Sequence, residues 1–200
     1  MDEAAAQPPI MTSRRFLLPL FGVAVLAGAA LVHARENSEP PPVYGSALAA
    51  FEDACVRPSS HDVIMRKVRA TRWERLEGDS APAVVSGNGA VRYAEVRRGE
   101  VAGAPVILAI GEFSGTSFCR VYFRAVDTAE MRGRLRAMNV LGAPLGEPDF
   151  DDKLISPDGW KAIGWHKSVN DQWRALHYSF DATGQGPDAA WQSIEITRKA

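Results

Sequence analysis

The two cysteines of the chain, Cys55 and Cys119, constrain its fold more than any other feature. Cys55 follows Phe51 in a segment with helical spacing of apolar residues. Cys119 lies in the segment Phe118–Val126, where apolar and polar residues alternate as in a half-buried strand. A bond between them would require the first helix of the domain to lie across the inner face of a sheet.

Whether these cysteines are bonded depends on the compartment, and the N-terminal segment predicts export. Arg14 and Arg15 precede an uncharged apolar run, Phe16–Val32, which closes on a V-x-A cleavage motif. We therefore predict a signal peptide over residues 1–34, with Met11 as an alternative start. An uncleaved membrane anchor is the alternative, since about 17 residues is the lower limit for crossing a bilayer. Either way the rest of the chain lies outside the cytoplasm, in the periplasm or secreted.

Outside the cytoplasm two lone cysteines are normally bridged, which predicts a Cys55–Cys119 disulfide. The bond would close a loop of about 64 residues and stabilise the fold by about 4 kcal/mol. The alternative, a nucleophilic or metal-binding thiol, lacks any C-x-x-C spacing to support it.

Residues 35–45 form a predicted Pro-rich linker, and residues 46–200 a single α+β domain with an antiparallel sheet and about three helices. Ser46, Ser60 and Asp127 are the predicted N-caps of these helices. We expect both N-terminal helices to be linked to the sheet through the disulfide.

Several segments have the alternation or the apolar content of strands. Asn88-Gly89 predicts a hairpin turn, and Pro105–Phe113 is the most apolar run and a predicted central strand. Three strands are predicted to close the chain in one antiparallel sheet, at about Trp160–Lys167, Gln172–Phe180 and Ala190–Arg198.

The alternation of these last strands predicts two different faces. If Lys167 pairs with Gln172, one face is aliphatic, and the other is aromatic and rich in histidine. The first face carries Ile163, Leu176, Tyr178 and Ile194, and the second carries Trp160, His166, Trp173, His177 and Trp191. In that register the two histidines lie about 13 Å apart, which disfavours a shared metal ion. The second face is a candidate ligand surface, unless the third helix covers it as a second core layer.

Known catalytic and cofactor motifs are absent from the sequence, so no catalytic residue, metal ligand or cofactor is predicted. Gly111-Glu-Phe-Ser114-Gly115 resembles a nucleophile elbow, but its serine is displaced by one position. An acidic stretch lacks the spacing of a calcium loop; it contains Glu147, Asp149, Asp151 and Asp152. The net charge of −1 gives no electrostatic footprint for nucleic acid.

The pattern resembles a loosely defined group of uncharacterised exported bacterial proteins. The shared features are a signal peptide, a helix with Phe51-x-x-x-Cys55, and Cys119 in a strand, over roughly residues 46–126. The resemblance implies a fold and a disulfide, and it carries no activity.

These observations favour a non-catalytic binding or accessory domain of the cell envelope, whose partner is an envelope ligand or protein. One alternative is an envelope hydrolase whose site is not readable from the sequence. Another is a membrane-anchored accessory subunit that keeps its apolar N-terminal segment.

Overall fold

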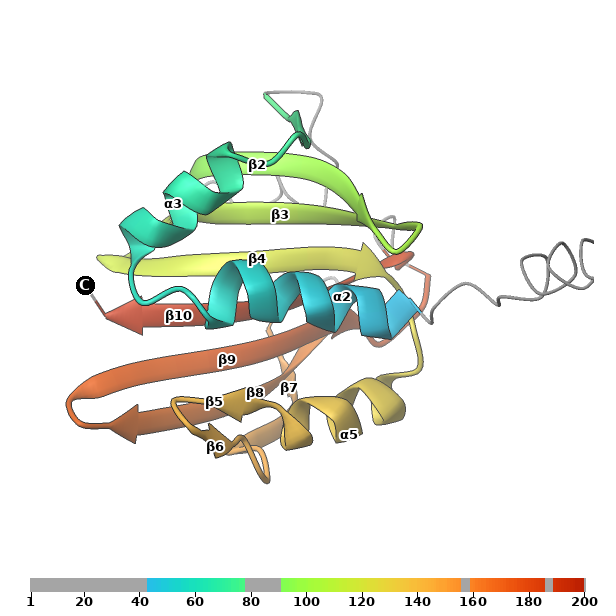
Figure 1. Cartoon of the computed structure of the whole chain (residues 1–200). Coiled ribbons are helices and arrows are strands. Elements are labelled where there is room, and N and C mark those ends of the chain that lie inside the picture. Colours follow the sequence, from blue (N-terminus) through green and yellow to red (C-terminus); the bar gives the residue numbers. More distant parts are fainter. Residues whose placement is uncertain (1–42, 78–90, 156–158, 186–188, 200) are drawn as a thin grey trace, which may run out of the picture. The chain divides into compact units, whose positions relative to one another are not determined.

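A computed structural model of the chain contains one large antiparallel sheet with helices packed on one of its faces (Figure 1). The structure describes residues 43–77, 91–155, 159–185 and 189–199. The predicted signal peptide, most of the predicted linker and the predicted turn at Asn88-Gly89 lie outside these ranges. No helix within the described ranges is long and apolar enough to cross a membrane.

The sheet has eight strands in the order β1-β2-β3-β4-β10-β9-β8-β7, and all neighbours are antiparallel. The strands are β1 (Glu74–Arg75), β2 (Arg92–Val101), β3 (Ala104–Phe113), β4 (Thr116–Arg124), β7 (Phe150–Leu154), β8 (Trp160–Val169), β9 (Gln172–Asp181) and β10 (Trp191–Lys199). A separate short hairpin joins β5 (Asn139–Val140) and β6 (Ala143–Pro144). The predicted α+β class with an antiparallel sheet is confirmed. Pairing of β10 with β4 joins the C-terminal strands to the central ones in one sheet.

The described helices lie on the same side of the sheet, which we call the helix face; the opposite side is the back face (Figure 1). They are α2 (Val43–Phe51), which continues as the π-helical segment η1 (Glu52–Val56), α3 (His61–Arg69) and α5 (Thr128–Ala137). The main core lies between these helices and the sheet. It includes Phe51, Ile64 and Leu135 from the helices.

Two of the three predicted helix caps are confirmed. The Ser60 hydroxyl accepts a hydrogen bond from the Val63 amide at 3.4 Å, and the Asp127 carboxylate accepts one from the Glu130 amide at 2.7 Å. The cap predicted at Ser46 was wrong, because α2 begins three residues earlier, at Val43. Ser46 instead lies inside the helix, where its hydroxyl is buried and has no hydrogen-bond partner among the described residues.

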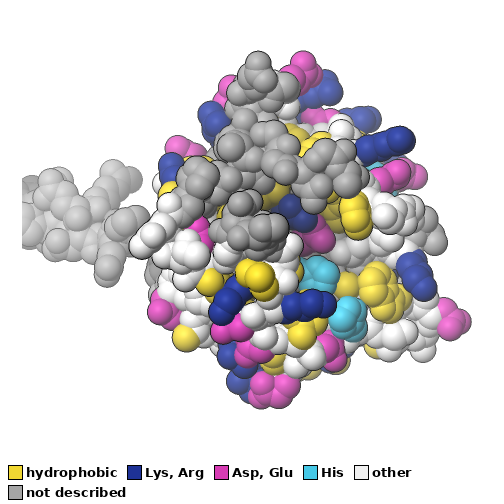
Figure 2. All heavy atoms as spheres, turned by 180° about the vertical axis from the view of Figure 1, so that it is seen from behind, with side chains coloured by type: hydrophobic (Ala, Val, Ile, Leu, Met, Phe, Trp, Pro, Cys, Tyr) yellow, Lys and Arg dark blue, Asp and Glu magenta, His cyan; other side chains and the backbone are white. Residues whose placement is uncertain are grey.

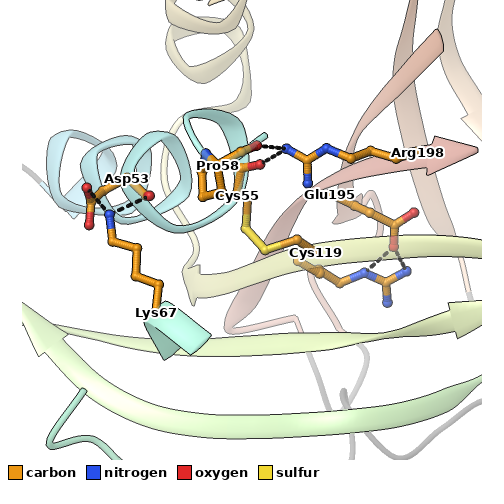
Figure 3. The surroundings of a disulfide bond; sticks show 8 residues. Asp53, Cys55, Pro58, Lys67, Cys119, Glu195 and Arg198 are labelled. Carbon is orange, nitrogen blue, oxygen red and sulfur yellow. Dashed lines mark hydrogen bonds and ion pairs between the residues drawn. A yellow bond between two sulfur atoms is a disulfide. The ribbon is translucent and has the colours of Figure 1, made fainter. Parts of the chain in front are cut away.

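The predicted disulfide is confirmed, with the Cα atoms of Cys55 and Cys119 5.5 Å apart (Figure 3). It joins η1 to β4, as expected from a cysteine on the inner face of an alternating strand. The expectation that both N-terminal helices are disulfide-linked was wrong, because α3 contains no cysteine and contacts the core through Ile64, Met65 and Val68 instead. Arg198 on β10 reinforces the same junction by donating to the carbonyl oxygens of Cys55 and Pro58.

The third helix, α5, packs on the helix face, because its buried Met131 and Leu135 belong to the same core as Ile163 and Trp165. It therefore does not cover the back face, which removes the proposed reason for treating the tryptophan and histidine surface as a second core layer.

Candidate functional site

The back face of the C-terminal strands carries the residues predicted for it. Pairing of Ile163 with Tyr178 and of Trp165 with Leu176 places those side chains on the helix face. The alternate residues therefore point to the back face, and they include Trp160, His166, Trp173, His177 and Trp191. Figure 2 shows this side of the molecule, where histidine side chains lie next to hydrophobic ones.

A pocket of about 440 Å³ lies on the back face, at the end of the sheet where the β3–β4 and β8–β9 hairpins turn. Its aromatic wall consists of Phe113, Phe118 and Trp173. Its ionisable side chains are those of Arg120, His166, His177 and Glu195. Three of the five predicted ligand-face residues, namely His166, Trp173 and His177, thus line one pocket.

The two histidines are neighbours, and the predicted separation of about 13 Å was wrong. Their ring centroids lie 6.3 Å apart. The β8–β9 hairpin pairs Val169 with Gln172 and turns through only Asn170 and Asp171, so the register differs by two residues from the predicted one. Both turn residues have positive φ, 48° and 61°, as the tightest two-residue hairpin turns require.

A carboxylate lies beside each histidine. Asp149 accepts a hydrogen bond from the His166 backbone amide at 2.5 Å, and the same carboxylate oxygen is 3.1 Å from His166 Nδ1. Glu195 Oε1 lies 3.9 Å from His177 Nδ1, beyond hydrogen-bond distance. Each imidazole therefore has an acidic neighbour on its Nδ1 side. Phe150 of β7 packs beside the pair, with its ring centroid 6.3 Å from that of His166 and 5.7 Å from that of His177.

Glu195 also belongs to a polar network at the base of the pocket. Arg120 donates to the Glu195 carboxylate through Nε at 2.7 Å and through a terminal nitrogen. The other terminal nitrogen of Arg120 donates to the Tyr122 hydroxyl at 2.9 Å. The Tyr122 hydroxyl in turn lies 3.4 Å from the Tyr93 hydroxyl. The positive charge at the base of the pocket is therefore balanced inside the protein, and the network presents both donors and acceptors.

Burial sets the protonation of the pocket groups. The pKa of His177 is lowered below its ordinary value of 6.5, and desolvation is the largest cause. Nearby His166 and Arg120 lower this pKa further, whereas the attraction of Glu195 raises it. Desolvation likewise raises the pKa of the Tyr93 hydroxyl, as does its neighbour Tyr122. For Arg120, burial opposes the charged form, but the attraction of Glu195 helps to raise its pKa overall. At neutral pH the imidazole of His177 is therefore neutral, and the guanidinium of Arg120 is charged.

Trp160 and Trp191 lie on the back face but do not line the pocket. Trp160 is six residues from His166 along β8, about 20 Å at strand spacing. Trp191 packs against a small second core that includes Ile107 and Tyr122. The guanidinium of Arg124 lies over the indole of Trp191, 4.4 Å from the ring centroid. The second core layer thus exists at one part of the face, and the pocket at another.

Three of the acidic candidates form ion pairs on the surface of the fold. In the acidic stretch, Glu147, Asp151 and Asp152 pair with Arg136, Arg132 and Lys161 respectively. Ser114 of the displaced elbow motif lies at the β3–β4 turn, with φ of 49°, and lines the back-face pocket. Over the described ranges, no group of three or more His, Cys, Asp or Glu side chains is placed to hold a metal ion.

Arg120 and Glu195 are the charged pocket residues that sequence reasoning did not select. Alternation along the strand places Arg120 on the face opposite to that of Cys119, and Glu195 lies between two inward-pointing isoleucines. The sequence therefore indicated that both side chains point to the back face. Their pairing required knowledge that β10 lies next to β4.

Comparison of the chain with protein-family models, with curated proteins and with solved structures finds no match.

Proposed function

We propose that this protein is an exported cell-envelope domain that binds a ligand in the back-face pocket without catalysing a reaction. The observation that carries the proposal is the grouping of Trp173, His166 and His177 in one pocket on a face free of described helices. The disulfide supports export, since such bonds persist in oxidising compartments outside the cytosol.

The pocket chemistry favours a sugar ring of an envelope polysaccharide. Trp173 is partly buried and offers a flat apolar ring at the pocket wall, suited to the C–H face of a sugar. A neutral His177 can donate and accept hydrogen bonds, and Glu195 accepts them. Because Arg120 is neutralised by Glu195, the pocket has no net charge that would demand an ionic ligand.

The test is a titration of intrinsic tryptophan fluorescence with disaccharide fragments of peptidoglycan. We expect a saturable change in the wild type that Trp173→Phe abolishes. Trp160→Phe is the matched control, because Trp160 lies on the same face outside the pocket, and it should leave the change intact. No change with any fragment would reject saccharide binding, and equal loss in both variants would place binding elsewhere.

The hydrolase alternative is favoured by one observation, the carboxylate beside each histidine. Chromatography of the same titration samples distinguishes it from binding. Cleaved fragments that disappear with His177→Gln would identify an enzyme, whereas intact fragments support a binding protein. The membrane-anchored accessory subunit would keep its N-terminal apolar segment in the purified protein.

A further inference from the structure

We propose that the helix face carries a second site, which binds a phosphate group beside Arg174. This site is independent of the back-face pocket, because the two lie on opposite sides of the sheet and share no lining residue.

A row of three cations crosses the sheet at this place. Lys167 on β8 pairs with Arg174 on β9, and Arg174 pairs directly with Arg198 on β10. Paired residues of neighbouring strands point to the same face, so the three charges are adjacent. Like charges in this position are destabilising, which requires a compensating interaction.

That compensation does not come from a negatively charged group in the described part of the chain. No described carboxylate lies within 4.0 Å of a charged nitrogen of Lys167, Arg174 or Arg198. The Nε of Arg198 is buried and has no hydrogen-bond partner. Burial lowers the pKa of Arg198 to about 10, with the charge of Arg174 as a further cause, and burial also lowers the pKa of Arg174.

Arg198 is held in place by the fold. One terminal nitrogen donates to the carbonyl oxygens of Cys55 and Pro58, at 3.2 Å for Pro58, next to the disulfide (Figure 3). The residue is 5% exposed, so its charge is fixed beneath the surface. Arg174 is only partly buried, and among the described residues its guanidinium donates one hydrogen bond, to the Trp173 carbonyl at 2.8 Å. Donors of Arg174 therefore remain available to a ligand.

A pocket of about 200 Å³ adjoins Arg174, between the end of η1 and β9. Its polar lining is Arg57, Ser59, Gln172 and Arg174. Arg57 is 70% exposed, and its ion pairs with Glu52 and Asp53 are long, at 3.8 and 3.9 Å. The pocket thus combines the guanidinium of Arg174, a hydroxyl group, an amide group, and the exposed guanidinium of Arg57.

A tetrahedral phosphate group suits this arrangement. The planar guanidinium of Arg174 can donate two parallel hydrogen bonds to phosphate oxygens, and Ser59 and Gln172 can donate to others. A bound dianion would also offset the repulsion between Arg174 and Arg198. Both free phosphate and the phosphate of a lipid headgroup have this chemistry.

The test measures binding of inorganic phosphate to the folded protein by calorimetry at constant ionic strength. We expect saturable binding by the wild type and affinity at least tenfold weaker for Arg174→Gln. Arg66→Gln removes the same charge from an exposed position on α3 and should change affinity less than twofold. No saturable binding by the wild type, or equal weakening in both variants, would overturn the proposal.

A second measurement distinguishes the sources. Vesicles of phosphatidylglycerol and phosphatidylcholine are sedimented with the protein, with pure phosphatidylcholine as the blank. Arg174-dependent binding to the anionic vesicles, competed by inorganic phosphate, identifies a headgroup site. Phosphate binding without vesicle binding identifies a site for soluble phosphate compounds. Saccharide binding in the back-face pocket should be unchanged by Arg174→Gln, so the two proposals fail separately.

Discussion

At the scale of single residues, the pocket histidines illustrate how a strand position controls protonation. His166 is 45% exposed in its side chain, whereas His177 is 34% exposed and faces Glu195, His166, Arg120 and Lys153. Desolvation, reinforced by the electrostatic effects of His166, Arg120 and Lys153, outweighs the attraction of Glu195. The neutral imidazole of His177 is therefore the form that the fold prefers.

This preference predicts a pH dependence of stability. The pKa of His177 is lower in the folded chain than the ordinary 6.5 expected after unfolding, so the unfolded state binds the proton more readily. The free energy of unfolding should fall as pH drops below about 6.5, level off below the folded pKa, and gain nothing from His177 above 6.5. Urea denaturation of wild type and His177→Gln at pH 7.5 and pH 5 measures this contribution. The loss on acidification should be smaller in the variant, and equal losses would contradict the assignment.

The residue-level interpretation of the sequence succeeded where alternation alone decides. Period-two spacing correctly assigned Trp173 and His177 to one face and Leu176 to the other, because the parity of a strand position follows from its neighbours. It could not show that Arg120 would meet Glu195, because their strands are 75 residues apart and the pairing depends on tertiary topology.

At the scale of elements, the β8–β9 hairpin shows why the distance between the histidines was mispredicted. The four-residue loop assumed around Ser168–Asp171 is a two-residue turn, because Asn170 and Asp171 both adopt left-handed conformations. The register moved by an even number, so every side chain kept its face while every cross-strand neighbour changed. The face of each side chain was thus predictable from the hydrophobic pattern. Which residues meet in the pocket depended on the left-handed φ angles of the two turn residues.

The junction between η1 and β4 gives a prediction for the disulfide. The bond links residues 64 apart, so its removal should free the unfolded chain and lower the free energy of unfolding by about 4 kcal/mol. Urea denaturation of the Cys55→Ala, Cys119→Ala double variant measures the loss. Reducing agent should destabilise the wild type similarly and leave the double variant unaffected. A double variant as stable as the wild type would contradict the role of the bond.

At the scale of the whole molecule, the sheet separates two chemical environments. The helix face contains the main core and the disulfide, with the row of Lys167, Arg174 and Arg198 at one end of its strands. The back face contains a small core near Tyr122 and the pocket near the β8–β9 turn. Since the described helices all pack on the helix face, a ligand can bind in the back-face pocket without loss of the main core.

Export is the prediction that concerns the chain as a whole. Arg14 and Arg15, the apolar run Phe16–Val32 and the V-x-A motif predict that signal peptidase removes residues 1–34. The buried disulfide agrees with this, because a cytoplasm rich in reduced thiols disfavours such bonds. Expression in a bacterial host, osmotic release of the periplasm and N-terminal sequencing should give a mature chain that begins near Arg35. Retention of residues 11–34 in a membrane fraction would exclude cleavage and support the anchored form, whereas a full-length chain with reduced cysteines in the cytoplasm would contradict export itself.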